Sequence, residues 1–186
     1  MRDPNKQQRL AITSEASVWV SASAGTGKTK VLTDRVLNLL LRGSNPQRIL
    51  CLTFTRAAAA EMESRILDTL GKWTMLEDNY LFEELEILIG GHVDSQVFDR
   101  ARTLFAEVVD APGGMNIQTI HAFCQSLLAR FPLEASVAPH FSLMEDRDTE
   151  QMLIIAREDL LTRARTGKNR RLGKALATVT AHTHET

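Results

Sequence analysis

Residues 18–31 read Val18-Trp-Val-Ser-Ala-Ser-Ala-Gly-Thr-Gly-Lys-Thr-Lys-Val31, a pattern that predicts a strand, a tight loop and the start of a helix. The residues before the loop suit a strand, and apolar residues at helical spacing follow it. This order of elements is typical of a phosphate-binding loop. The residues that we expect to contact the ligand are Ala22, Ser23, Ala24, Gly25, Thr26, Gly27, Lys28, Thr29 and Lys30.

The chemistry of this loop follows from its residue types. Gly25 and Gly27 permit backbone angles that let successive N–H groups turn toward an anion, and the positive end of the following helix adds to the same point. Lys28 would bring a full charge to the β- and γ-phosphates, and the Thr29 hydroxyl would coordinate Mg²⁺. Ala22 stands where the usual pattern has Gly. The alternative is an ordinary helix start in a glycine-rich turn.

The composition is that of a soluble globular protein with one core, or one core and a smaller appended unit. The 186 residues are 44% hydrophobic and 24% charged. No apolar run approaches the length that crosses a bilayer, so we expect a cytoplasmic protein with no membrane partner. Cys51 and Cys124 lie in apolar contexts, which predicts two buried free thiols.

The net charge of −1 hides an uneven distribution. Residues 1–75 carry 11 basic and 6 acidic side chains, whereas residues 76–111 carry 2 and 9. The ends of the chain can therefore face an anion, and the middle cannot. The basic run from Arg163 to Lys174 is open to two interpretations, a nucleic-acid contact or a solvated helix face.

The pattern after the loop predicts an α/β fold, with a parallel sheet flanked by helices and a helical appendage at the C-terminal end. A continuous apolar run over residues 48–55 predicts a strand buried on both faces, and an Ala-rich helix follows with Thr55 as N-cap. Ligands of such sheets lie beyond the carboxyl ends of the strands. Thr53, Phe54 and Thr55 therefore stand on the ligand side.

Further segments complete the expected order. Apolar stripes predict core helices over residues 78–89 and from Ser95, and a short strand from Met115 runs into a helix with Thr119 and His121 at the junction. A histidine there is ordinarily a packing or capping residue. A short helix within residues 3–16 carries Gln8, whose amide suits the edge of adenine, although surface glutamines are common. We place one domain at residues 1–140 and a second at 141–186.

Four of these segments resemble motifs of superfamily 1 DNA helicases of the UvrD/Rep/RecB type. Asn5–Arg9 resembles their Q motif, and Ala22–Thr29 resembles motif I. Leu52-Thr-Phe-Thr-Arg-Ala-Ala-Ala-Ala-Glu-Met62 resembles motif Ia, and Gln118-Thr-Ile-His-Ala-Phe123 resembles the segment called Ib or Ic. Arg56-Ala57 in place of Asn-Lys is more like the A subunit of the bacterial AddAB helicase–nuclease than like UvrD.

The resemblance implies a RecA-like P-loop domain 1A, the start of helical subdomain 1B, and the cofactors ATP and Mg²⁺. It implies that Gln8 contacts adenine while Lys28 and Thr29 hold phosphate and magnesium. It further implies single-stranded and double-stranded DNA as partners, an AddB-like second subunit, and work in double-strand break repair and recombination. The DNA-contacting residues carried over are Thr53, Phe54, Thr55, Arg56, Thr119 and His121.

No Asp-Glu strand and no arginine-finger motif follow these segments, and hydrolysis needs a carboxylate to hold magnesium and orient water. We therefore expect the N-terminal portion of a longer motor, with any nuclease domain at the far C-terminus, and no ATP turnover by this chain alone. Two other classes stay open. One is a self-contained P-loop kinase or NTPase acting on a small molecule, and the other is a binding module that keeps the loop for stability.

Overall fold

The fold is described from a computed structural model that covers residues 6–13, 15–21, 23, 25, 27–144, 146–166 and 169–183. The chain divides into two compact units, Met1–Arg130 and Phe131–Thr186, and each unit is described by itself. The domain boundary that the sequence suggests, after residue 140, falls within the second unit.

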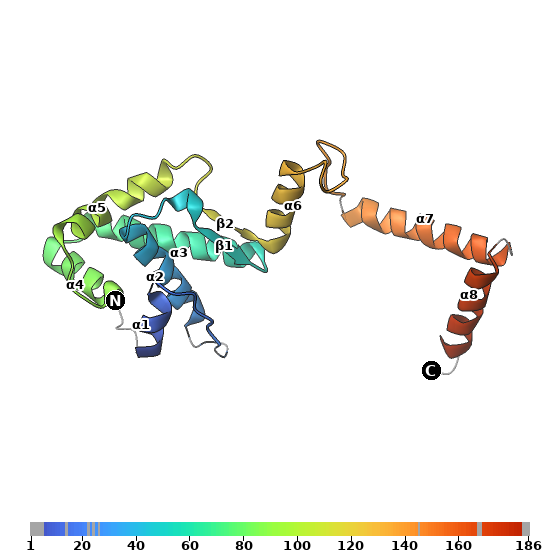
Figure 1. The fold of residues 1–186 in the computed structure, drawn as a ribbon, viewed down its shortest axis with the longest axis horizontal. Coiled ribbons are helices and arrows are strands. Elements are labelled where there is room, and N and C mark those ends of the chain that lie inside the picture. Colours follow the sequence, from blue (N-terminus) through green and yellow to red (C-terminus); the bar gives the residue numbers. More distant parts are fainter. Residues whose placement is uncertain are drawn as a thin grey trace. The chain divides into compact units, whose positions relative to one another are not determined.

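Most described residues are helical, as Figure 1 shows. In the first unit the elements are α1 (Lys6–Ile12), α2 (Lys28–Leu41), the 3-10 turn η1 (Pro46–Arg48), β1 (Leu50–Thr53), α3 (Arg56–Met75), α4 (Asp78–Ile89), α5 (Ser95–Val109), β2 (Asn116–Thr119) and α6 (Ile120–Arg130). In the second unit they are α7 (Asp146–Arg165) and α8 (Arg170–Thr183).

The helix ends follow the capping residues in the sequence. The Thr55 hydroxyl accepts a hydrogen bond from the Ala58 backbone N–H at 3.1 Å and caps α3, as predicted. The Asp94 carboxylate does the same for the Val97 N–H at 2.8 Å and caps α5. Gly90 ends α4 in the left-handed conformation, with φ of 74°. These local signals explain why the predicted helices begin and end where they do.

β1 and β2 pair in parallel, so the predicted parallel sheet is present, and among the described residues it has two strands. Two expectations about it were wrong. Residues 17–21 have no regular secondary structure, and β1 is not buried on both faces because Leu50 and Leu52 are 45% and 43% exposed. An extended segment becomes a strand only where a neighbour pairs with its backbone, and no described strand pairs with residues 17–21.

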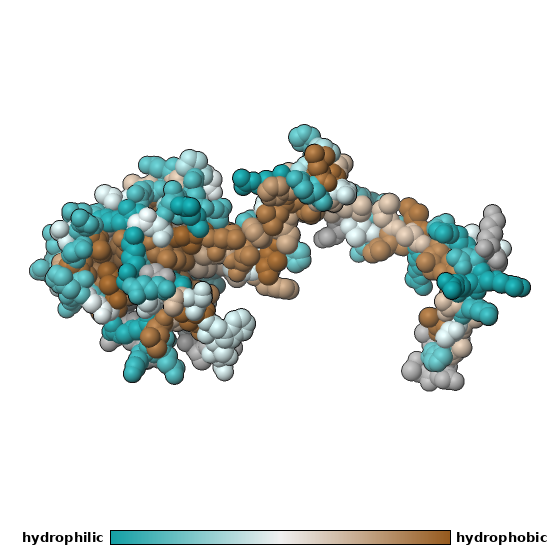
Figure 2. Space-filling view, in the orientation of Figure 1, coloured by the Kyte–Doolittle hydropathy of each residue, from teal (hydrophilic) through white to brown (hydrophobic). Residues whose placement is uncertain are grey.

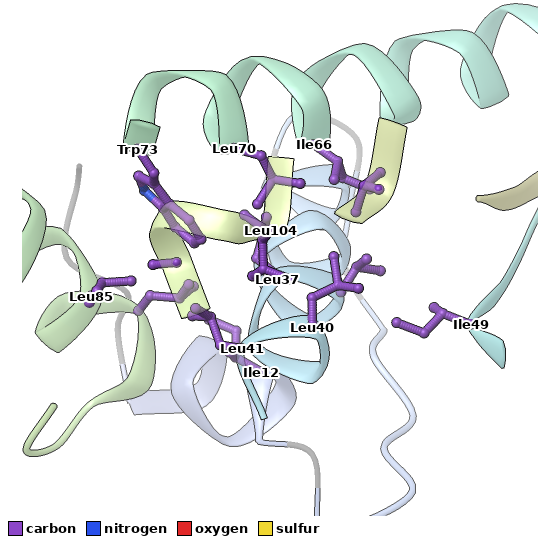
Figure 3. Packing of buried hydrophobic residues seen from close by; sticks show 14 of the residues in the cluster. Ile12, Leu37, Leu40, Leu41, Ile49, Ile66, Leu70, Trp73, Leu85 and Leu104 are labelled. Carbon is purple, nitrogen blue, oxygen red and sulfur yellow. The ribbon is translucent and has the colours of Figure 1, made fainter. Parts of the chain in front are cut away.

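The core of the first unit lies between its helices. Most residues of the predicted stripes of α4 and α5 are buried or partly buried, with Leu81, Leu85 and Leu104 fully buried, whereas Phe105 is 36% exposed. Trp73 of α3 is fully buried with them, and Ile12 of α1 and Leu41 of α2 belong to the same cluster (Figure 3). The helices therefore hold the first unit together while the small sheet lies at its margin.

An ion pair joins α3 and α4 at the margin of the core. The Glu84 carboxylate accepts hydrogen bonds from the Lys72 ammonium and from the Trp73 indole N–H, the latter at 3.3 Å. Burial acts to raise the pKa of Glu84, but the hydrogen bond and charge of Lys72, together with the Trp73 N–H, outweigh it, so the pKa lies below its usual range. Glu84 is thus a charged group that the core accepts because its partners are in place.

The two thiols differ in their surroundings. Cys51 is half-buried in β1, and burial raises the pKa of its thiol. Cys124 is exposed, so the prediction of a buried thiol was wrong there. The reason is that α6 buries none of its residues. No helix in the described ranges is long and apolar enough to span a bilayer.

In the second unit α7 and α8 cross closely. A Cβ on Gly173 would lie 3.3 Å from the Ala164 carbonyl oxygen, and Ala164 is buried. The basic run begins here with Arg163, which pairs with Asp159 at 3.4 Å within α7. Its described members are exposed, and Lys168 lies outside the described residues. These positions suit a solvated helix face, and a nucleic-acid contact stays a prediction.

Candidate functional site

The glycine-rich loop leads directly into α2. Gly25 and Gly27 have φ of 79° and 87°, the left-handed region that glycine enters without strain. Gly27 is the N-cap of α2, so the backbone N–H groups of the first turn of α2 lie at the loop. The predicted contact residues Ala22, Ala24 and Thr26 lie outside the described residues. The two described glycines of the loop have the left-handed conformation that anion-binding turns use.

Three side chains of the first turn of α2 have different surroundings. The Lys28 ammonium donates to the Ser23 carbonyl oxygen at 2.7 Å, which places its charge across the loop. The Thr29 side chain is exposed at the helix start. Lys30 forms an ion pair of 2.5 Å with the buried Asp34, one turn along the helix. Lys28 is thus directed over the loop, whereas Lys30 is directed along α2.

The short helix α1 brings Gln8 to the loop. Its side-chain amide nitrogen lies 3.7 Å from the position that a Cβ on Gly27 would take. A cavity of about 470 Å³ lies beside it, and Gln8, Trp19 and Lys28 are among its lining residues. An amide and an ammonium therefore share one cavity, an arrangement that suits a ligand with both a polar ring edge and negative charge.

A second group of predicted residues gathers at the carboxyl ends of β1 and β2. Thr53 and Thr119 are Cα partners in the parallel register. The Thr119 hydroxyl accepts from the Ala122 backbone N–H at 3.1 Å and caps α6, just as Thr55 caps α3. The Thr53 hydroxyl donates to the Thr55 carbonyl at 2.9 Å. Two capped helix N-termini therefore start from adjacent strand ends.

The remaining predicted residues at this edge are open to solvent. Phe54 is 80% exposed, and Arg56 and His121 are exposed on the first turns of α3 and α6. Figure 2 shows hydrophobic surface around β1, β2 and α6. The exposed Phe54 ring, just before the N-cap of α3, offers stacking to a base, and the helix N-termini at this edge offer partial positive charge to a phosphate.

A comparison with protein families shows which family has this loop and this sheet edge. The model of the UvrD/REP helicase N-terminal domain matches residues 4–185. The chain belongs to the UvrD/Rep helicase family. Within this family the chain resembles proteins that are named as the A subunit of an ATP-dependent helicase/nuclease.

Three such relatives of this UvrD/Rep family chain illustrate the match. The protein of Pediococcus pentosaceus is 31% identical over 172 residues, which are 90% of this chain and 12% of the relative. The proteins of Lactobacillus johnsonii and Lactobacillus helveticus are each 35% identical, over 80% of this chain and 10% and 11% of their own lengths. The chain therefore spans about a tenth of the length of the curated relatives that it matches.

The structure also places two residues at the loop helix that the sequence did not single out. Arg35 and Asn38 of α2 hydrogen-bond to backbone carbonyls at the end of α1. An arginine and an asparagine inside an amphipathic helix give no signal of such a role, because their acceptors come from a segment that is distant in sequence. Only the packing of α1 on α2 reveals them.

Proposed function

We propose that this chain is the ATP-binding and DNA-contacting N-terminal part of an ATP-dependent DNA helicase, of the kind that forms the A subunit of a helicase/nuclease. The observation that carries the proposal is the position of the Gln8 amide against a glycine-rich loop that the Lys28 ammonium crosses. Family membership supports it, because the relatives bear that name. The activity and the partners of the whole protein are part of the proposal.

The described residues fit a nucleotide. Gly27 is left-handed at the start of α2, which places the backbone N–H groups of the first helical turn where phosphate oxygens could accept from them. Lys28 would move its ammonium from the Ser23 carbonyl to the β- and γ-phosphates, and Gln8 would hydrogen-bond the adenine edge. Lys30 would stay close to the bound nucleotide through its place on the first turn of α2. Magnesium would neutralise phosphate charge when bound.

Thr29 is the residue that we assign to magnesium. Its side chain is exposed at the start of α2, so the hydroxyl is open to a metal that arrives with the phosphates. The part of the chain that the structure describes contains no cluster of three or more His, Cys, Asp or Glu side chains suited to a metal. Within this chain Thr29 is therefore the side chain that we assign to the ion, and the carboxylate that hydrolysis needs would come from elsewhere in the longer protein.

DNA is the ligand that we assign to the edge formed by the ends of β1 and β2. Phe54 would stack on a base, and Arg56 would contact a phosphate. Thr53, Thr55, Thr119 and His121 would line the same path, with the two helix N-termini behind them. Closing and opening of a nucleotide cleft in the whole protein would then move single-stranded DNA past this edge.

In the longer protein, this chain would belong to a larger domain arrangement. The first unit would be part of a RecA-like domain 1A, and helices α7 and α8 would begin subdomain 1B. Double-stranded DNA would be the substrate in break repair and recombination, with nuclease activity elsewhere in the protein. The partner would be a second, AddB-like protein of the same assembly, and the protein would work in the cytoplasm.

Magnesium-dependent binding of a fluorescent ATP analogue tests the nucleotide site. We expect wild-type chain to bind, and Lys28→Ala to lose about tenfold or more in affinity, which corresponds to ~1.4 kcal/mol or more. Lys174→Ala is the matched control, because Lys174 is an exposed lysine of α8 in the other unit. Equal binding by wild type and Lys28→Ala would contradict the proposal.

ATP hydrolysis measured in parallel separates the remaining alternatives. Binding without turnover supports the motor portion. Robust turnover by this chain alone, without DNA, would instead favour a self-contained P-loop kinase or NTPase. A folded chain that binds no nucleotide would favour a module that keeps the loop for stability.

A further inference from the structure

Arg35 of α2 ties down the end of α1. One terminal nitrogen, Nη1, donates to the Ala11 carbonyl at 2.9 Å and also to the Thr13 carbonyl. The other, Nη2, donates to the Ala16 carbonyl at 2.8 Å. The Asn38 amide adds a bond of 3.3 Å to the Ile12 carbonyl between them. Two side chains of the loop helix therefore satisfy the carbonyls at which α1 ends.

These hydrogen bonds matter for the stability of α1 because the helix is short. The last carbonyls of a helix have no partners within it, and a cation there is favoured by the helix dipole. Arginine keeps its charge at every working pH and presents donors in a fixed fork. A helix of 7 residues is too short to persist without tertiary contacts. The conformation and place of α1 therefore depend on what α2 supplies.

The same helix carries Gln8 to the loop. Gln8 precedes Ile12 by one turn, so the two side chains share a face of α1. Ile12 is 2% exposed within the core cluster, and the Gln8 amide nitrogen lies near Gly27. A rotation or shift of α1 on α2 would therefore move the Gln8 amide away from the loop.

We propose that Arg35 is a positioning residue for nucleotide selection, which holds α1 in the register that sets Gln8 at the adenine edge. The inference rests on the proposed function, since it takes Gln8 as the contact that recognises adenine. Arg35 touches no nucleotide in this role. It acts through the three carbonyls of α1 and the turn after it.

Competition against a fluorescent ATP analogue, with ATP or ITP as competitor, tests the inference. ITP carries the same triphosphate but lacks the 6-amino group that the Gln8 amide would accept from. We expect wild type to prefer ATP, and Gln8→Ala to lose that preference. Arg35→Met should lower ATP affinity about tenfold and leave ITP affinity within about twofold. Arg35→Met added to Gln8→Ala should cause no further loss.

Controls separate positioning from folding. Arg65→Met is the matched variant, because Arg65 is a surface arginine that pairs with Glu61 within α3; it should behave as wild type. Arg35→Lys keeps the charge without the fork and should lose about threefold of the preference for ATP. Hydrogen exchange should rise in α1 of Arg35→Met and stay unchanged in α3. If Arg35→Met does not fold, the ATP and ITP affinities of Arg35→Lys are compared with those of wild type instead.

The outcomes distinguish this inference from the proposed function. Equal losses of ATP and ITP affinity in Arg35→Met would mean a general structural role and overturn the inference. A preference for ATP that survives in both Arg35 variants would also overturn it. A wild-type chain that binds ATP and ITP equally would overturn the assignment of Gln8 to adenine. The positioning role of Arg35 would then fall with it.

Discussion

Thr53 and Thr119 are Cα partners at the carboxyl ends of two parallel strands, although more than sixty residues separate them in sequence. Thr119 itself caps the helix that follows β2, and Thr55, two residues after Thr53, caps the helix that follows β1. Two strand-to-helix junctions therefore stand side by side. Both helix N-termini start from the same edge of the sheet, and this edge is where we propose that DNA binds.

Phe54 should dominate the affinity of that edge for single-stranded DNA. It is 80% exposed, so its ring is open to a base. Replacement by Ala should cost about 1–3 kcal/mol of binding free energy, because base stacking on an aromatic ring is lost. Fluorescence anisotropy of a labelled oligothymidylate measures the change. Phe131→Ala, at a half-exposed phenylalanine of the second unit, is the control; equal effects of the two variants would argue against this edge.

The capping threonines should contribute to stability as well as to the proposed site. Thr55→Ala removes the acceptor of the Ala58 N–H, so the free energy of unfolding should fall by about 1 kcal/mol. Thr55→Ser keeps a hydroxyl at the same place and should recover most of that loss. Urea unfolding followed by circular dichroism provides the measurement, and an alanine variant as stable as wild type would contradict the cap.

The two tryptophans should differ in how strongly the same conservative change lowers stability. Trp73 is fully buried and donates to Glu84, whereas Trp19 is 93% exposed. Trp73→Phe should lower the free energy of unfolding by about 1–3 kcal/mol, because a buried carboxylate loses a donor and the core loses volume. Trp19→Phe should change it by less than about 0.5 kcal/mol. Thermal unfolding of the two variants makes the comparison.

Stability should depend on pH through Glu84. Its pKa lies below the usual range in the folded chain, mainly because Lys72 opposes the effect of burial. The stabilisation is therefore fully present above the unfolded pKa of about 4.3 and is lost as pH falls through the lower folded value. Glu84→Gln should make stability less dependent on pH between about pH 5 and 3. Urea unfolding across that range tests it, and parallel curves for wild type and variant would contradict the assignment.

The local features of this protein can be predicted from its residues alone. The sequence predicted the loop and α2 from the Gly-Lys-Thr segment, the N-cap Thr55, the end of α4 at Gly90 and the buried stripes of α4 and α5. Each feature depends on residues that are close in sequence, through helix capping, glycine conformation or helical periodicity. The resemblance of four segments to helicase motifs also came from the sequence, and the family match confirmed it.

Features that depend on partners distant in sequence are seen only in the folded chain. The pairing of Thr53 with Thr119 needs two strands to align, and Leu50 is 45% exposed because the described residues cover its face of β1 only in part. The role of Arg35 depends on carbonyls that α1 presents from outside α2. The residues before the loop were expected as a strand and have no pairing partner in the described part of the chain. Local propensity cannot predict these features. A paired strand, a buried face or a hydrogen bond between segments forms only when the partner segment is in place.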